Sequence, residues 1–132
     1  MTQQKTKKRK PATSKGGHLL EVEDLSVYFF TRRGVARAVD GVSFHLDVGE
    51  SLGIVGESGS GKSVTSLGML RLVPPPGQVV AGHVYLEGED LTQISGQAMR
   101  KIRGRKMSMI LQDPMTSLNP SFAIGSQVSE AI

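Results

Sequence analysis

The sequence contains no cysteine and no tryptophan among its 132 residues, and no run of apolar residues approaches the ~18 that a membrane-spanning helix needs. The lack of cysteine excludes a disulfide-stabilised secreted scaffold and any metal or redox site built on thiolates. The basic start of the chain leads into residues 11–17, which include proline, serine and glycine, rather than into an apolar signal core. We therefore expect a soluble chain of one domain without an export signal.

The net charge of +4 belongs to the N-terminal tail rather than to the rest of the chain. Residues 1–17 carry six cations and no acid, which leaves ten cations against twelve acids, a charge of −2, in residues 18–132. The tail has almost no large apolar side chain to bury, so we expect it to be disordered. A solvated extension is the simplest interpretation of such a run, and contact with nucleic acid or an anionic membrane leaflet is the alternative.

Alternating apolar and polar residues predict two half-buried strands at the start of the domain. The first strand covers residues 18–29, where the alternation slips at Glu23 and Asp24, so a bulge or bend is expected there. The second strand covers residues 42–48, with an apolar side chain at every second position up to Val48. One face of each strand is therefore expected in the core and the other in water.

The next stretch of the sequence predicts a strand, a glycine-rich loop and a helix in that order. Residues 52–55 are a short apolar run, which suits a strand that is covered on both faces, as in a parallel sheet. Residues 62–73 then change to the apolar spacing of a helix, which Pro74 is expected to end. The glycine-rich residues between these two elements therefore lie at the N-terminus of a helix.

The second half of the sequence continues the alternation of strands and helices, which places the chain in the α/β class. Residues 84–86 and 107–111 predict two short strands, and the helix between them is expected to begin with Ser95 as its N-cap and to stop at Gly104. An apolar stripe at intervals of four has just begun where the sequence stops, at Ile124, Val128 and Ile132. Because a domain that ended there would leave this face uncovered, the sequence favours the N-terminal portion of a longer protein.

Residues 56–63 match the phosphate-loop pattern of glycine, four residues, glycine, lysine and then serine or threonine. Glycines permit backbone angles at which successive amide groups turn inward around a phosphate, and the helix dipole favours the same anion. Lys62 is expected to reach the β- and γ-phosphates, and the Ser63 hydroxyl to bind Mg²⁺. The predicted nucleotide site comprises Gly56, Glu57, Ser58, Gly59, Ser60, Gly61, Lys62, Ser63 and Val64. By itself this motif does not decide whether the nucleotide is ATP or GTP, or whether the protein is a kinase or a motor.

The stretches GIVGESGSGKS, residues 53–63, and ILQDPMTSLNP, residues 110–120, strongly resemble the ATP-binding subunits of ABC transporters of the oligopeptide, dipeptide and nickel importer group. The resemblance runs from about Leu19 to Ile132. It implies an α/β P-loop NTPase fold in which a three-layer core, truncated after the Q-loop, is joined to an N-terminal antiparallel β lobe. It also implies ATP and Mg²⁺ as cofactors, and ATP hydrolysis that powers the uptake of peptides or a related solute.

The resemblance assigns roles to two further residues. Gln112 corresponds to the Q-loop glutamine, which is expected to help coordinate Mg²⁺ or the attacking water and to relay the nucleotide state to the permease. Its place after a predicted strand fits the edge at which α/β sheets bind ligands. From the residues alone, 107–113 could instead be a Walker B strand that ends in Asp113, although Ser108 interrupts the run and no second acid follows.

An aromatic residue on the first strand stacks on adenine in many relatives, and alignment places Phe29 at that position, with Tyr28 as the fallback. Phe29 shares a face with Leu25 and Val27 by periodicity, so plain core packing remains the alternative interpretation of this ring. The three histidines, His18, His45 and His83, are far apart in the sequence and lack metal-ligand spacing, so no chemistry is expected of them.

The family's signature motif, its Walker B aspartate with the catalytic glutamate and its switch histidine would all follow the position of Ile132. We therefore expect these 132 residues alone not to hydrolyse ATP at the rates of the family. The implied partners are a second ATPase subunit, an integral membrane permease that contacts the Q-loop region and, indirectly, an extracytoplasmic solute-binding protein. The implied location is cytoplasmic, on the inner face of the membrane. The alternatives to an ABC importer ATPase are another P-loop NTPase, a nucleotide kinase and a basic-tailed nucleic-acid-binding module.

Overall fold

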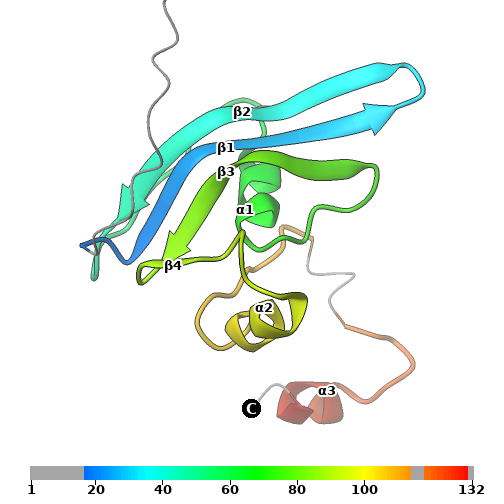
Figure 1. Cartoon of the computed structure of the whole chain (residues 1–132). Helices are drawn as coiled ribbons and strands as arrows, with labels where there is room; N and C mark the ends of the chain where they lie inside the picture. The colour runs from blue at the N-terminus through cyan, green and yellow to red at the C-terminus, as the bar shows by residue number, and fades with distance from the viewer. Residues whose placement is uncertain (1–16, 114–117, 131–132) are drawn as a thin grey trace, which may run out of the picture.

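The computed structural model describes residues 17–113 and 118–130, so the predicted disorder of the basic tail, apart from Gly17, lies outside the described residues. An antiparallel sheet forms the upper layer in Figure 1, with α1 directly beneath it and α2 further below. The elements in chain order are β1 (Leu20–Thr31), β2 (Gly34–Leu46), α1 (Lys62–Met69), β3 (Gly77–Leu86), β4 (Glu89–Asp90), α2 (Gly96–Ile102) and α3 (Ile124–Glu130). The α/β class and the antiparallel β lobe are confirmed.

The sheet has the strand order β2-β1-β3-β4, and every neighbouring pair is antiparallel. The predicted bulge in the first strand is confirmed, because the pairing of β1 with β2 shifts register between Val22 and Leu25. Asp24 has a φ of 47° at this point. Gly82 of β3 lies against the bulge, where a Cβ atom would come within 2.5 Å of the Leu25 Cα. The local slip in the hydrophobic pattern therefore fixes a bend that the neighbouring strand must accommodate.

The core lies between the sheet and the first two helices. Helix α1 approaches the sheet closely at Gly68, where a Cβ atom would lie 3.0 Å from the Val27 side chain. Helix α2 is capped as predicted, since the Ser95 hydroxyl accepts a hydrogen bond from the amide of Ala98 at 3.1 Å. Its buried side chains join those of the strands in one cluster that includes Leu20, Val22, Leu25, Met69, Leu70, Val84, Leu86, Leu91, Met99 and Ile102.

Helix α1 ends four residues earlier than the prediction of a helix to Val73, so that boundary was wrong. Arg71 adopts a φ of 53°, and the amide of Leu72 donates to the carbonyl of Leu67 at 2.8 Å, which closes the helix in a Schellman arrangement. The guanidinium group of Arg71 donates to the carbonyls of Leu91 and Ile94 at 3.3 and 2.8 Å. These contacts from a distant part of the chain hold the strained residue, so α1 stops before Pro74 is reached.

The two strands predicted at 52–55 and 107–111 are not formed, and that prediction was wrong. Residues 52–55 are all exposed, with 94% at Val55. In the second segment Ile110 is 97% exposed, whereas Met107 and Met109 are partly buried against the core. A strand requires a neighbour that supplies a hydrogen-bonded ladder, and in the described part of the chain the only pairing here is the isolated bridge between Arg103 and Met107. Val48, predicted on the buried face, lies beyond the end of β2 and is 82% exposed.

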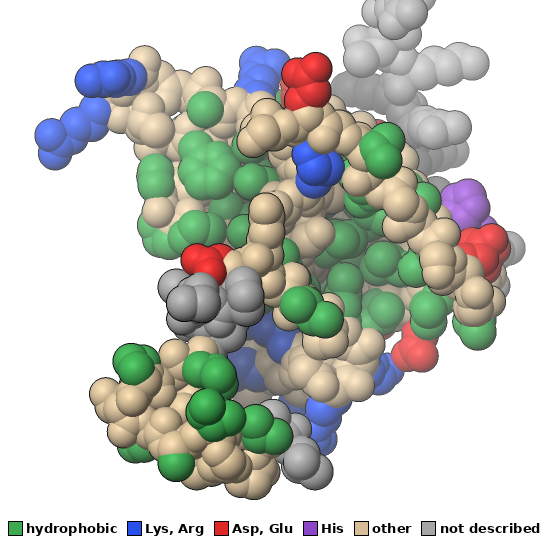
Figure 2. Space-filling model, turned by 180° about the vertical axis from the view of Figure 1, so that it is seen from behind, with side chains coloured by type: hydrophobic (Ala, Val, Ile, Leu, Met, Phe, Trp, Pro, Cys, Tyr) green, Lys and Arg blue, Asp and Glu red, His purple; other side chains and the backbone are tan. Residues whose placement is uncertain are grey.

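Residues near the C-terminus form the short helix α3, in agreement with the apolar stripe that begins at Ile124. Phe122, Ile124 and Val128 are exposed, and Figure 2 shows apolar side chains gathered on the surface of this segment at the lower left. Ile132 lies outside the described residues. Among the helices that the structure describes, none combines the length and apolar character needed to cross a membrane.

Candidate nucleotide-binding site

The loop of residues 56–61 connects the extended segment 52–55 to the first turn of α1. The amide of Ser60 donates to the carbonyl of Glu57 at 3.2 Å, which closes a tight turn within the loop. Gly61 is the N-cap of α1 with a φ of 92°, and no side chain among the described residues caps the helix there. Because the first amides of a helix have no partner within it, they present hydrogen-bond donors and a partial positive charge at the loop.

Two glycines of the loop lie in close contact with their surroundings. A Cβ atom at Gly61 would lie 2.3 Å from the carbonyl oxygen of Ala38, so this part of the loop rests directly on the backbone of β2. A Cβ atom at Gly56 would lie 2.6 Å from the Ser60 hydroxyl oxygen, which faces it across the loop. The loop is therefore a compact cradle that rests on β2 at Gly61 and is narrow between Gly56 and Ser60.

Lys62 folds back over this cradle. Its ammonium group donates hydrogen bonds to the carbonyls of Gly56 and Glu57 at 2.7 and 2.6 Å, and to the Ser60 hydroxyl at 3.1 Å. The cation is thus held by neutral oxygen atoms of the loop itself. Since charge-assisted bonds to anionic oxygens are stronger, a phosphate group placed in the loop would compete well for the same ammonium protons.

Lys62, Ser63 and Gln112 line one open cleft of about 340 Å³, although Gln112 lies 49 positions after Ser63 in the sequence. The cleft therefore combines an ammonium group, a hydroxyl group and a carboxamide in one place. Asp113 is not among the described residues that line it. The remaining lining residues are Leu52, Ile54, Ser66, Met109 and Ile110. The cleft has the mixed apolar and polar walls typical of a ligand site.

The two aromatic residues considered for adenine stacking lie on β1, outside the set of described residues that line the cleft. The Phe29 ring covers Gly77, where a Cβ atom would come within 2.6 Å of the ring. The Tyr28 hydroxyl donates to the Asp40 carboxylate at 2.6 Å, and this hydrogen bond raises the pKa of Tyr28. The stacking role of Phe29 stays a prediction.

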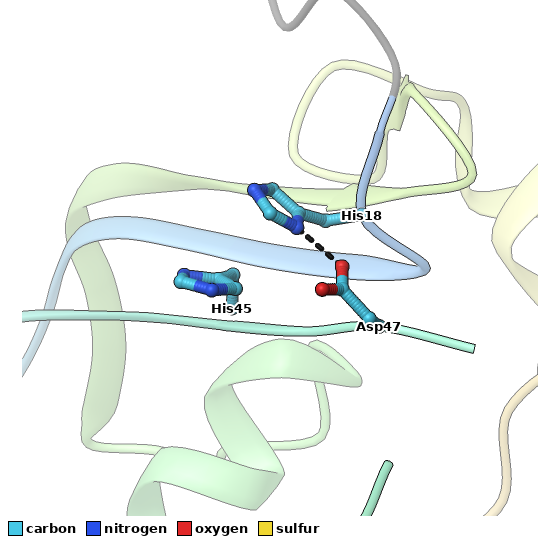
Figure 3. Close-up of side chains that lie close together, drawn as sticks. All are labelled: His18, His45 and Asp47. Carbon is cyan, nitrogen blue, oxygen red and sulfur yellow. Dashed lines mark hydrogen bonds and ion pairs between the residues drawn. The ribbon is translucent and has the colours of Figure 1, made fainter. Parts of the chain in front are cut away.

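Sequence reasoning missed a second cluster, because it treated the histidines as far apart. His18 and His45 are brought together by the pairing of β1 with β2, and their rings stack with centroids 4.1 Å apart. His18 Nδ1 lies 2.5 Å from Asp47 Oδ1, as Figure 3 shows. The usable signal was the antiparallel hairpin, which places the start of one predicted strand beside the end of the next.

The third histidine forms a separate pair on the opposite side of β1, between β3 and β4. His83 Nδ1 lies 2.8 Å from Asp90 Oδ2. Burial would raise the pKa of Asp90, but hydrogen bonds from the Thr92 hydroxyl and amide and from His83 outweigh it, so the pKa is lowered. In its ionised form this carboxylate therefore stabilises the turn that follows β4 and links it to β3.

Comparison with known proteins finds that the family model described as ABC transporter matches residues 39–131. The chain is similar to the oligopeptide transport ATP-binding protein OppD of Bacillus subtilis, with 52% identity over 115 residues, which is 86% of this chain and 32% of the relative. It is similar to the dipeptide transport ATP-binding protein DppD of Escherichia coli, with 49% identity over 114 residues, 86% of this chain and 35% of the relative. The chain thus spans about a third of the length of the curated relatives that it matches.

Proposed function

Because this chain belongs to the ABC transporter family, we propose that it is the ATP-binding part of an importer ATPase that powers the uptake of peptides or a related solute. The observation that carries the proposal is the cleft in which the phosphate-loop residues Lys62 and Ser63 lie with Gln112. The proposed solute class is that of the relatives, which are named as oligopeptide and dipeptide transport proteins. The whole protein's activity rests on the family, since the chain covers about a third of those relatives.

The residues present fit a bound nucleotide triphosphate with Mg²⁺. The loop that would surround the phosphates rests on β2 at Gly61, and it leads into the N-terminus of the eight-residue helix α1. Backbone amides from Gly56 to Val64 would hold the β- and γ-phosphates. The Ser63 hydroxyl and the Gln112 carboxamide oxygen would hold Mg²⁺, whose preferred ligands are oxygens. The metal ion would neutralise negative charge on the phosphates.

Lys62 and Gln112 are the residues proposed to act in catalysis. Lys62 would exchange its bonds to the carbonyls of Gly56 and Glu57 for bonds to phosphate oxygens, which stabilises charge that develops during phosphoryl transfer. Gln112 is neutral and would orient the attacking water through hydrogen bonds. As the Q-loop glutamine it would also report the nucleotide state to the permease.

Phe29 is proposed to stack on the adenine base. The supporting observation is that its ring is carried by β1, one of the two central strands of the sheet against which α1 packs, and is only partly buried. The proposed direct partners are a second ATPase subunit and a membrane permease, which the chain would contact at the inner face of the membrane. A solute-binding protein is proposed as an indirect partner. We also propose that the 132 residues by themselves bind ATP without hydrolysing it at the rates of the family, which an assay of phosphate release would measure.

Calorimetric titration of the chain with ATP and excess Mg²⁺ tests the function. Lys62→Ala is expected to weaken binding by about 10-fold or more, because one charge-assisted contact is worth roughly 1.5–3 kcal/mol. Lys106→Ala is the matched control, since this lysine pairs with Glu87 at 2.7 Å and does not line the cleft. An unchanged affinity in Lys62→Ala, or no heat from the folded chain with any purine nucleotide, would contradict the proposal.

A further inference from the structure

We propose that His18, His45 and Asp47 form a surface site for a divalent transition-metal ion, with Zn²⁺ as the ion whose ligand preferences fit best. One ligand atom from each residue lies within 4.8 Å of the other two. Figure 3 shows the Nδ1 atom of His18 and the carboxylate of Asp47 facing one another, with the ring of His45 beside them. The proposal concerns the edge of the sheet and is independent of the nucleotide site.

The fold brings these three side chains together through strand pairing. Leu20 of β1 pairs with Leu46 of β2, and both are directed toward the core, one buried and the other partly buried. Side chains alternate between the two faces of a strand, so His45 and Asp47, on either side of Leu46, lie together on the outer face. His18 precedes Leu20 and lies over this pair, where its ring stacks on His45.

Asp47 is fixed in position by the turn that ends β2. Its amide donates to the Glu50 carboxylate at 2.9 Å, and its carbonyl accepts a hydrogen bond from the Glu50 amide at 3.2 Å. Gly49 has a φ of 82° within this turn. The carboxylate is therefore held toward His18 before any ion binds, which reduces the ordering that binding must impose.

The donor atoms suit zinc more than magnesium or calcium. Imidazole nitrogen is a preferred ligand of zinc, copper and nickel, whereas hard cations require mainly oxygen ligands. Two imidazoles and one carboxylate would supply three ligands of a tetrahedral site, and the half-exposed position leaves the fourth ligand to water.

The electrostatic surroundings favour a cation. The Glu50 carboxylate lies at this edge, since it accepts a hydrogen bond from the amide of Asp47 at 2.9 Å. Glu21 pairs directly with His45 across the two strands, which brings another carboxylate to this edge. Two acids that are not among the three ligands therefore contribute a negative potential at the site.

His83 and Asp90 provide a matched control within the same chain. Their side chains form the same type of pair at 2.8 Å, and the His83 ring lies against Tyr85 instead of a second histidine. With only one imidazole and one carboxylate, this pair lacks a third ligand among the described residues. It is therefore not expected to bind zinc at micromolar concentration.

The test is calorimetric titration of the untagged 132-residue chain with ZnCl₂ in the presence of about 5 mM Mg²⁺, which occupies oxygen-rich sites and competes poorly for imidazole. One zinc ion per chain is expected. His45→Ala and Asp47→Asn are each expected to weaken binding by about 10-fold or more, since changes even to the supporting residues of metal sites cost that much. His83→Ala is expected to leave the affinity unchanged.

Chemical modification of histidine supplies a second measurement that needs no substitution. Zinc is expected to protect His18 and His45 from diethyl pyrocarbonate while His83 continues to react, as followed by peptide mass spectrometry. Circular dichroism verifies that each variant is folded. Absence of saturable zinc binding to the folded chain, an equal loss in His83→Ala, or undiminished reactivity of His18 and His45 in zinc would overturn the proposal.

Discussion

Replacement of Gly61 by alanine tests whether the phosphate loop depends on its contact with β2. Alanine must adopt a φ of 92° at this position, which costs about 1–2 kcal/mol. Its Cβ atom would also lie 2.3 Å from the Ala38 carbonyl oxygen, and relief of such overpacking costs about 1–3 kcal/mol more. We therefore expect Gly61→Ala to lower the free energy of unfolding by about 2–5 kcal/mol.

Gly59→Ala is the matched control for this substitution. Gly59 has a similar φ of 81°, but a Cβ atom there meets nothing within 4 Å, so only the backbone cost of about 1–2 kcal/mol applies. Urea unfolding followed by circular dichroism measures both variants, and Gly61→Ala should unfold at the lower urea concentration. If the two variants lose the same stability, the contact between the loop and β2 contributes nothing and the reasoning is refuted.

Two further predictions concern Asp90 and Phe29. The pKa of Asp90 in the folded chain lies below its ordinary value of 3.8, so the unfolded chain binds more protons as the pH falls. The stability that Asp90 contributes is therefore complete above pH 3.8 and is lost as the pH falls through the folded pKa. The difference in the urea midpoint of unfolding between the wild type and Asp90→Asn should therefore be largest near neutral pH and should shrink in acid. A difference that stays constant with pH would contradict this prediction. Phe29→Ala should weaken the binding of Mg-ATP by about 5-fold or more and leave the binding of tripolyphosphate unchanged, since base stacking is worth about 1–3 kcal/mol. Phe30→Ala, at an exposed neighbouring position, is the control, and equal losses for both ligands would exclude a stacking role.

Features determined by neighbouring residues could be predicted from the sequence. The phosphate-loop pattern places Lys62 and Ser63 on the first turn of α1, and the structure has them there. The bulge at Asp24 and the capping of α2 by Ser95 could also be predicted. Each depends on hydrogen bonds or side-chain alternation within a few residues. The family resemblance added Gln112, which no local pattern could assign.

Features that depend on distant contacts could not be predicted. The end of α1 is set by Arg71, whose guanidinium group reaches carbonyls about 20 positions further along the chain. The segments 52–55 and 107–111 have the apolar composition of strands, but composition does not supply a hydrogen-bonded neighbour. His18 and His45 were dismissed on their separation in the sequence, which the β1–β2 pairing removes.

The exposed segments on either side of the phosphate loop have a practical consequence for work with this chain. Leu52, Ile54 and Val55 present apolar side chains to solvent outside any strand, as do Ile110 and Leu111. Extended stretches of this kind readily recruit a complementary peptide from another molecule. Concentrated samples are therefore prone to self-association, and measurements of ligand affinity are best made dilute, with the hydrodynamic radius monitored by light scattering throughout.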